Sequence, residues 1–306
     1  MKITVKELTT VGPTIHSSFS ALPFKRDQTG SGRLAKPVLA YQTSSCIKII
    51  GDIHRFQAYQ ASGQATVAAY LIQESESTFE LLQLIIEYYS PMSLMDKALL
   101  SRSALELGVP RPELAKRLFP EMDLPPREKL IDQILFLLKL PSSLQTFIVE
   151  KDLSLKRALI FQRADQHLDW VETLISNLKI GINMSAEIIQ NIWEMSKRDG
   201  VDFQAKAEEM GLWEMAYTEF QDTRFAVMEI RDKINAARFP TLDKAGRDLS
   251  KNLDEANLPA QVKVKWDPYF EQQGVDISFH ATNDTELDEV LEKLSSKAFK
   301  NIFTHL

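Results

Sequence analysis

The N-terminal part of the chain alternates short apolar runs with polar breaks. Residues 38–42 and 46–50 are apolar, β-branched runs separated by three polar residues, a spacing that predicts a β-hairpin. The second run stops at Gly51, a helix-like segment follows at once, and residues 67–72 form a third apolar run. We therefore predict a small α+β domain over residues 1–76.

Beyond this domain the apolar positions change to a helical period. Positions 79, 82, 85, 86 and 89 are apolar or aromatic, which predicts a helix. It should end before Ser90-Pro91, because the residue before proline avoids helical geometry. Glycine and proline separate further helical segments, so we predict a helical domain over residues 77–240. These segments cover residues 93–107, 111–119, 126–139, 142–150, 154–163, 166–179 and 185–198, with one or two more between 201 and 239.

The last part of the chain returns to strand-like alternation. A polar helix over residues 241–256 precedes two alternating segments, 261–266 and 274–279. Residues 283–286 read Asn-Asp-Thr-Glu, a capping-box start for one more helix. We predict a small α/β segment over residues 241–306, which is too small for a robust core of its own. It should dock on the helices or on a second copy of itself.

Composition narrows the functional classes. A length of 306 residues suggests two or three domains, and 44% apolar with 25% charged residues is typical of a soluble globular protein. No apolar run approaches the roughly 18 residues of a membrane span. The single cysteine, Cys46, excludes an internal disulfide, fits a cytoplasmic location and is predicted to be a small core residue. The net charge of −6 does not favour DNA binding, although local basic patches matter more.

A basic pair marks the point where the second strand meets its helix. His54 and Arg55 follow Gly51 and Asp52. The first amides of a helix lack internal partners and the helix dipole favours anions there, while arginine forks onto phosphate oxygens. Gly51 would let the backbone approach a ligand closely. We predict a nucleotide- or phosphate-binding site at these four residues; the alternative is that Arg55 pairs with an acid and His54 lies on the surface.

The most basic short stretch lies just upstream. Residues 25–36 hold four basic residues and one acid, together with glycine and serine. This composition predicts a mobile loop. The loop is interpreted either as solvated surface or as a phosphate-contacting loop beside the basic pair.

Residues 51–58 resemble the corresponding segment of the ParB/sulfiredoxin-like domain. Its members carry Asp-Gly-x-His-Arg or Gly-Glu-Arg-Arg, followed by an aromatic residue, a variable one and alanine; here the segment reads Gly-Asp-Ile-His-Arg-Phe-Gln-Ala. The resemblance implies binding of a nucleoside triphosphate, CTP in ParB proteins, with Mg²⁺, and at most a CTPase activity. Residues 30–37 are shorter than the family's upstream helix and lack its glutamine, which leaves hydrolysis open.

A second and longer resemblance covers residues 95–165. Residues 113–118, 135–141 and 144–158 are similar to the helix-turn-helix of ParB-like proteins and to the helix pair after it. The resemblance implies an α+β chain with an all-α helix-turn-helix domain and a small α/β tail. It assigns Arg127, Lys129 and Gln133 to base edges, and Arg111, Lys116 and Arg117 to phosphates.

The charge of this region is less one-sided than that of most DNA readers. Between Arg111 and Lys139 there are six basic and five acidic residues, and the turn over residues 119–126 is longer than the usual three to four. A helical scaffold that binds a protein partner therefore remains an alternative interpretation.

The implied function is DNA binding in chromosome or plasmid partition or in transcription regulation, gated by a nucleotide. Residues 274–291 resemble the strand–helix ending that serves dimerisation in ParB-like chains, which implies a homodimer. A nucleotide-hydrolysing enzyme is the rival class. No catalytic residue is assigned, and the five histidines do not have metal-ligand spacing.

Overall fold

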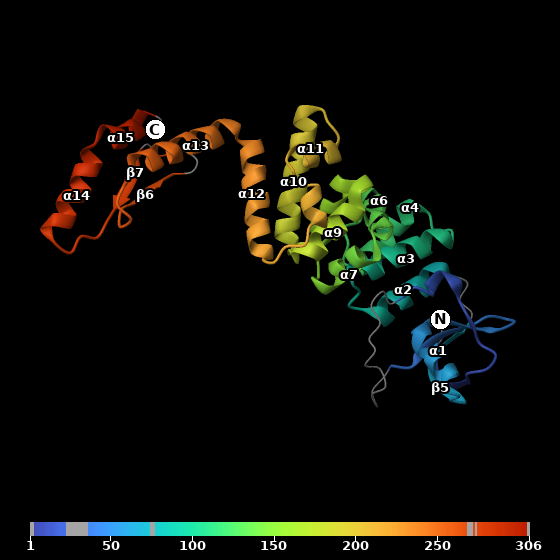
Figure 1. The fold of residues 1–306 in the computed structure, drawn as a ribbon. Coiled ribbons are helices and arrows are strands. Elements are labelled where there is room, and N and C mark those ends of the chain that lie inside the picture. The colour runs from blue at the N-terminus through green and yellow to red at the C-terminus, as the bar shows by residue number, and fades with distance from the viewer. Residues whose placement is uncertain (1–2, 23–35, 74–76, 268–271, 273, 305–306) are drawn as a thin grey trace. The chain divides into compact units, whose positions relative to one another are not determined.

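The computed structural model, shown as a ribbon in Figure 1, describes residues 3–22, 36–73, 77–267, 272 and 274–304. The chain forms two compact units, Met1–Glu172 and Thr173–Leu306. The predicted division at residues 76 and 240 is finer and remains a prediction. Within the described part of the chain, no helix is long and apolar enough to cross a membrane.

The first unit begins with a five-stranded sheet in the order β1-β5-β3-β4-β2. The predicted hairpin is confirmed: β3 and β4 run antiparallel, with Gln42 opposite Ile47. The third predicted strand, β5, lies parallel to β3, whereas β1 and β2 were not predicted. The strands are β1 (Ile3–Thr9), β2 (Thr14–Ile15), β3 (Val38–Gln42), β4 (Ile47–Gly51) and β5 (Thr66–Gln73).

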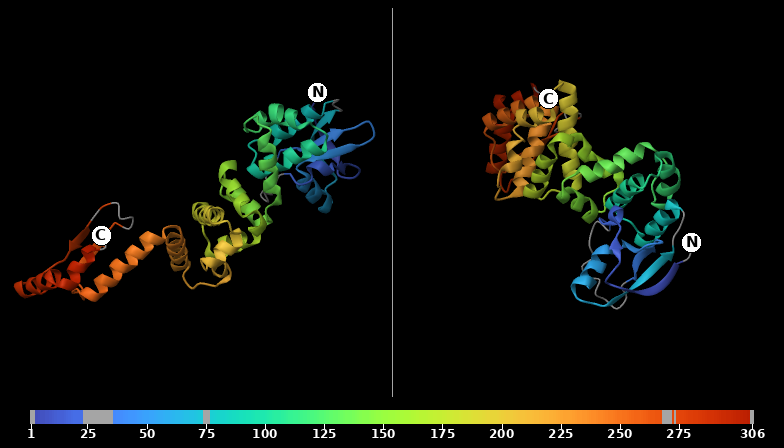
Figure 2. Two further views of the ribbon diagram at one scale, coloured as in Figure 1. Left: turned by 90° about the horizontal axis from the view of Figure 1, so that it is seen from above. Right: turned by 90° about the vertical axis from the view of Figure 1, so that its right-hand side faces the viewer.

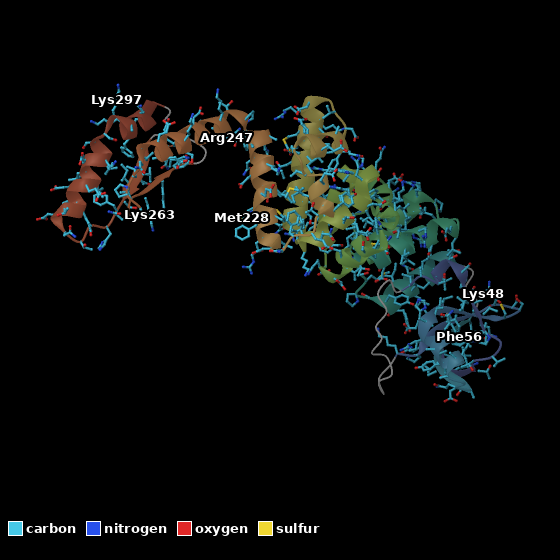
Figure 3. All side chains as sticks on the ribbon, in the orientation of Figure 1. Lys48, Phe56, Met228, Arg247, Lys263 and Lys297 are labelled. Carbon is cyan, nitrogen blue, oxygen red and sulfur yellow. The ribbon has the colours of Figure 1, made fainter. Side chains whose placement is uncertain are left out.

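Helix α1 (Ile53–Ala61) follows β4 directly, as the sequence predicted. Ile53 and Phe56 are fully buried, and Figure 3 labels Phe56 in this part of the molecule. The prediction that Cys46 is a core strand residue was wrong. Its amide donates to the Thr43 hydroxyl at 3.0 Å, and the half-buried side chain lies in the hairpin turn, because β4 begins one residue later.

The helices of the first unit are arranged around α3 (Leu94–Glu106), whose buried residues occur on several sides of the helix. Ser93 and Asp96 form a capping box at its start, in which each side chain accepts from the other residue's backbone amide. α4, η2 and α5 run on as one helical stretch over residues 111–121. The others are α2 (Thr78–Tyr89), α4 (Arg111–Glu113), η2 (Leu114–Leu118), α5 (Phe119–Glu121), α6 (Lys129–Phe136), η3 (Leu137–Lys139), α7 (Ser142–Glu150), α8 (Leu155–Ala158) and η4 (Leu159–His167). The division between the two units falls within the next helix, α9 (Leu168–Leu178).

The second unit contains a helical part and a small α/β part, both visible in Figure 2. In the α/β part, β6 and β7 pair antiparallel beside a core of Leu249, Ala256 and Phe299. Asn283 caps the next helix through the Glu286 amide at 2.9 Å, as predicted. Together the two units confirm the predicted α+β fold class. The elements are α10 (Ile182–Asp199), α11 (Phe203–Glu209), η5 (Glu214–Tyr217), α12 (Thr223–Arg238), α13 (Pro240–Ala256), β6 (Lys263–Trp266), β7 (Val275–Ser278), α14 (Asp284–Ser295), α15 (Lys297–Lys300) and η6 (Asn301–Thr304).

Candidate functional site

The junction of β4 and α1 contains all four predicted phosphate-binding residues. Gly51 ends the strand, Asp52 turns the chain in a left-handed conformation with φ 53°, and Arg55 lies on the first turn of α1. The Asp52 side chain does not cap this first turn. His54 lies half-buried on the same turn.

Packing against neighbouring residues explains why position 51 is a glycine. A Cβ atom there would lie 2.7 Å from the Leu39 Cβ and 3.1 Å from a ring carbon of Tyr88. Gly51 itself is buried, so any side chain would push against the neighbouring strand and against α2. This requirement exists without a ligand, and the close-approach role inferred from the sequence remains a prediction.

Arg55 is engaged by the chain itself. Its Nη2 donates to the Asp52 carboxylate and to the Lys36 carbonyl, and it lies 3.4 Å from the Tyr88 hydroxyl. The Arg55 side chain is 18% exposed and that of Asp52 is 26% exposed. The alternative raised by the sequence, that Arg55 pairs with an acid, therefore describes the geometry at this residue.

Two tyrosines at the end of α2 complete the cluster. The Tyr88 hydroxyl lies 2.7 Å from Asp52 Oδ2 and 2.9 Å from the Pro37 carbonyl oxygen, while the Tyr89 hydroxyl accepts from the Asp52 amide at 2.7 Å. Burial is the largest cause that raises the pKa of both hydroxyls well above the ordinary value, and the Asp52 carboxylate raises both further. Both stay protonated, so Tyr88 can donate to the carboxylate.

The tyrosines were missed by sequence reasoning, although a signal existed. Tyr88 and Tyr89 close the predicted helix at positions 79–89, and a polar aromatic pair at the buried end of a helix usually needs hydrogen-bond partners. Nothing local identified those partners, because they lie more than thirty residues upstream.

A small pocket adjoins the cluster. It has a volume of about 280 Å³ and is lined by Lys36, Leu39, Tyr70, Leu84, Glu87 and Tyr88. The Lys36 ammonium lies 5.8 Å from the Tyr88 ring centroid. The rest of the predicted basic loop, residues 25–35, lies outside the described residues.

The six predicted DNA-contact residues lie on or next to residues 111–121 and α6, and two of them are engaged by acids. Arg111 pairs with Asp132 of α6 at 2.7 Å. Arg117 lies 3.8 Å from Glu113 and 3.9 Å above the Phe79 ring. These contacts hold both guanidinium groups against the protein, although both residues remain exposed.

Three others are exposed cations. Lys116, Arg127 and Lys129 have no ion pair with any residue that the structure describes, and all three are exposed. The predicted helix start at residue 126 was too early: α6 begins at Lys129, which leaves Arg127 in the preceding turn. Pro126 disfavours helical geometry at the residue before it, Pro125, which keeps residue 125 out of the helix.

Gln133 lies in a different environment from these cations. It is half-buried and lines a hollow of about 720 Å³ between α3, α6 and the start of α8. Lys97 and Lys156 line the same hollow, together with Asp123 and Asp152. Gln133 is therefore less accessible than Arg127 or Lys129.

Comparisons with known proteins give similarity at the level of structure. No family model matches the chain, and no curated protein matches it. The chain is similar to a C-terminally truncated chromosome-partitioning protein ParB from Caulobacter crescentus, complexed to the centromeric parS site. That match has 14% identity and a TM-score of 0.33, and covers 60% of this chain and 98% of the other.

A second similar structure is the C-terminally truncated ParB from Caulobacter crescentus complexed with CTP-gamma-S. It has 17% identity and a TM-score of 0.24, and the match covers 53% of this chain and 94% of that one. Both of these structures are of a ParB chromosome-partitioning protein, and their low TM-scores give no residue-by-residue correspondence.

Proposed function

We propose that this chain is a ParB-like protein that binds duplex DNA in chromosome or plasmid partition or in transcription regulation. The observation that carries the proposal is the group of exposed cations at the start of α6. Lys129 is the first residue of α6 and Arg127 lies two residues before it, while Lys116 lies on the preceding helical stretch. An exposed helix start with free cations beside it suits contacts to phosphate oxygens and base edges.

Charge pairing divides the predicted contacts into two classes. An arginine already held by a carboxylate gains less from a phosphate, because the incoming contact replaces an existing one. Arg111 and Arg117 are of this kind. Lys116, Arg127 and Lys129 should therefore carry more of the affinity, and Gln133 should reach a base only from within its hollow.

A salt titration of DNA binding tests the proposal. Fluorescence anisotropy with a labelled duplex pool should show binding at low salt that weakens steeply as salt rises. Each phosphate contact that is lost lowers the slope of log K against log salt by about one. The double variant Arg127→Ala/Lys129→Ala should lower that slope by one to two, and Arg111→Ala should lower it less.

The matched control removes two exposed lysines of α13. Lys244→Ala/Lys251→Ala changes the net charge by the same amount and should leave the slope unchanged. Undetectable binding at low salt would remove the DNA proposal and favour a protein-binding scaffold. An equal effect of the two double variants would show that binding does not use the start of α6.

We also propose that the β4–α1 junction binds a nucleotide, CTP with Mg²⁺ being the first candidate, which gates DNA binding. The supporting observations are Arg55 and His54 on the first turn of α1, which the Asp52 side chain does not cap, and the 280 Å³ pocket lined by Tyr88, whose hydroxyl lies 3.4 Å from Arg55 Nη2. The donors fit phosphate oxygens. Mg²⁺ is usually bound through the phosphates of the nucleotide and keeps several waters, so it would arrive with the CTP phosphates.

The C-terminal part supports a proposed homodimer. Leu287 and Leu291 are four residues apart on α14 and are 38% and 47% exposed, so they share one face of the helix. Ile277 and Phe279 are each 38% exposed at β7 and just after it. A second copy of the same part would cover these apolar groups.

A further inference from the structure

The guanidinium group of Arg55 is only partly used by its partners. Nη2 meets the Asp52 carboxylate, the Lys36 carbonyl and the Tyr88 hydroxyl. Nε is buried and has no hydrogen-bond partner among the described residues. One donor is therefore satisfied by a carboxylate while another donor of the same group stays unused, which is unfavourable for a buried polar atom.

Asp52 occupies the N-cap position of α1 without capping the helix. An aspartate at this position usually accepts from an amide of the first turn. Here the backbone is left-handed, with φ 53° and ψ 42°, and the carboxylate accepts from Arg55 and Tyr88 instead. Carboxylates and phosphates offer arginine the same paired oxygens. The Asp52 carboxylate thus lies where an oxygen of a bound phosphate is expected.

We propose that Asp52 is an internal competitor for Arg55, so that a phosphate group binds only after displacing the Asp52 carboxylate. This inference rests on the proposed nucleotide-binding role of the β4–α1 junction. A carboxylate and a phosphate repel each other at the same guanidinium group. The protein therefore has a closed form, in which Asp52 neutralises Arg55, and an open form, in which Arg55 faces the ligand.

Tyr88 makes the opening possible at low cost. Its hydroxyl lies 2.7 Å from Asp52 Oδ2 and 2.9 Å from the Pro37 carbonyl oxygen, and a hydroxyl has one proton to donate. When the carboxylate leaves, the hydroxyl donates to Pro37 and remains satisfied. Since Tyr88 lies at the end of α2, ligand binding at Arg55 changes a hydrogen bond made by the first helix after the sheet.

Calorimetric titration of the full chain with CTP, and separately with tripolyphosphate, tests this competition. Asp52→Asn removes the negative charge, keeps the size and tolerates the left-handed backbone. If the open form makes up about a tenth of the molecules, removing the competitor should tighten the apparent affinity about tenfold. Tyr88→Phe weakens the hold on Asp52 and should tighten binding by a smaller factor. Arg55→Ala should abolish binding.

The control is Asp152→Asn. Asp152 is another aspartate with a left-handed backbone, φ 45°, but it is exposed. It belongs to the loop before α8, so its substitution should leave the titration unchanged. If wild type binds, Arg55→Ala does not, and Asp52→Asn binds no tighter than wild type, the competition is refuted and the nucleotide role stands. If neither wild type nor Asp52→Asn binds CTP or tripolyphosphate, the nucleotide role and the competition both fall.

Discussion

At the scale of single residues, the cluster around Asp52 depends on a glycine that leaves room for two neighbours. Gly51 lies between Leu39 of β3 and Tyr88 of α2. The same close approach brings the Tyr88 hydroxyl to Asp52. Packing at Gly51 and hydrogen bonding at Asp52 are therefore parts of one arrangement, and a change at the glycine should disturb both.

Gly51→Ala should destabilise the sheet locally. The added methyl group meets the Leu39 Cβ, an atom fixed to the backbone, and overpacking of this kind costs about 1–3 kcal/mol. Amide hydrogen exchange of β3 and β4, read by mass spectrometry, should then become roughly 5- to 150-fold faster. Gly246→Ala is the control, because a Cβ at Gly246 of α13 meets nothing within 4 Å. Unchanged exchange in β3 and β4 of Gly51→Ala would contradict the packing role.

At the scale of elements, periodicity predicted most segments, and long-range pairing determined what it missed. The hairpin, α1, α7 and the helix ending at Arg238 lie where the sequence predicted them. β1 was missed although it pairs along its whole length with β5. Its partner strand lies some sixty residues away, so no short turn in the sequence indicates the pairing.

The candidate site follows the same rule. Its location and the basic pair could be predicted from a strand, a glycine and a helix start in a row. Pairing of Arg55 with an acid was one of the alternatives that the sequence left open, and Asp52 is only three residues away. The contacts of Arg55 with Lys36 and Tyr88 could not be predicted, because these residues come from separate segments whose approach depends on the folded sheet. Local patterns thus identify where an anion site can form, and tertiary contacts decide what occupies it.

The junction of α10 and α11 provides a prediction about pH. Lys206 is 3% exposed, and its ammonium lies 2.5 Å from Asp199 and 2.7 Å from Glu209. Hydrogen bonds from Arg198 and Lys206 hold the pKa of Asp199 well below the ordinary value. Burial opposes a charged lysine, but the two carboxylates outweigh it and raise the pKa of Lys206.

The sign of the pH effect follows from these directions. A depressed carboxyl pKa stabilises the fold above its unfolded value of about 4, and a raised lysine pKa stabilises it below about 10.4. Stability of the second unit should therefore fall as the pH drops below about 4 and as it rises above about 10. In Lys206→Met the acid-side fall contributed by Asp199 should be smaller.

Urea unfolding followed by tryptophan fluorescence measures this effect. At neutral pH, the free energy of unfolding of Lys206→Met should be about 1–3 kcal/mol lower than that of the wild type. The substitution removes the buried ammonium group that hydrogen-bonds to two carboxylates. Lys197→Met changes an exposed lysine of α10 in the same way and should lose little. If both variants have the pH profile of the wild type, the Lys206 contacts do not control acid stability.

At the scale of the whole molecule, the second unit ends in a part with more apolar surface than its small core can cover. Leu249, Ala256 and Phe299 form that core, while Leu287, Leu291 and other apolar groups stay exposed on it. Figure 3 also labels Met228, which is 60% exposed on α12. Val290 of α14 is fully buried, and Leu287 and Leu291 lie three residues before it and one residue after it, so the two leucines flank the buried side of α14.

A single charge on that face should separate the two copies. In a symmetric dimer Leu291→Asp removes two buried leucines, each worth at least about 1.5 kcal/mol, so the dissociation constant should rise on the order of 100-fold or more. Light scattering after size exclusion, over a range of protein concentrations, measures this change. Thr285→Asp adds the same charge to the exposed first turn of α14, where the helix dipole favours it, and should leave the dimer intact.

Because avidity multiplies the affinity of two linked DNA-binding regions, Leu291→Asp should also weaken binding to long duplexes while the Arg127 and Lys129 contacts remain. A wild-type chain that is monomeric at tens of micromolar would contradict the dimer and leave single-copy DNA binding to be judged by the salt titration alone.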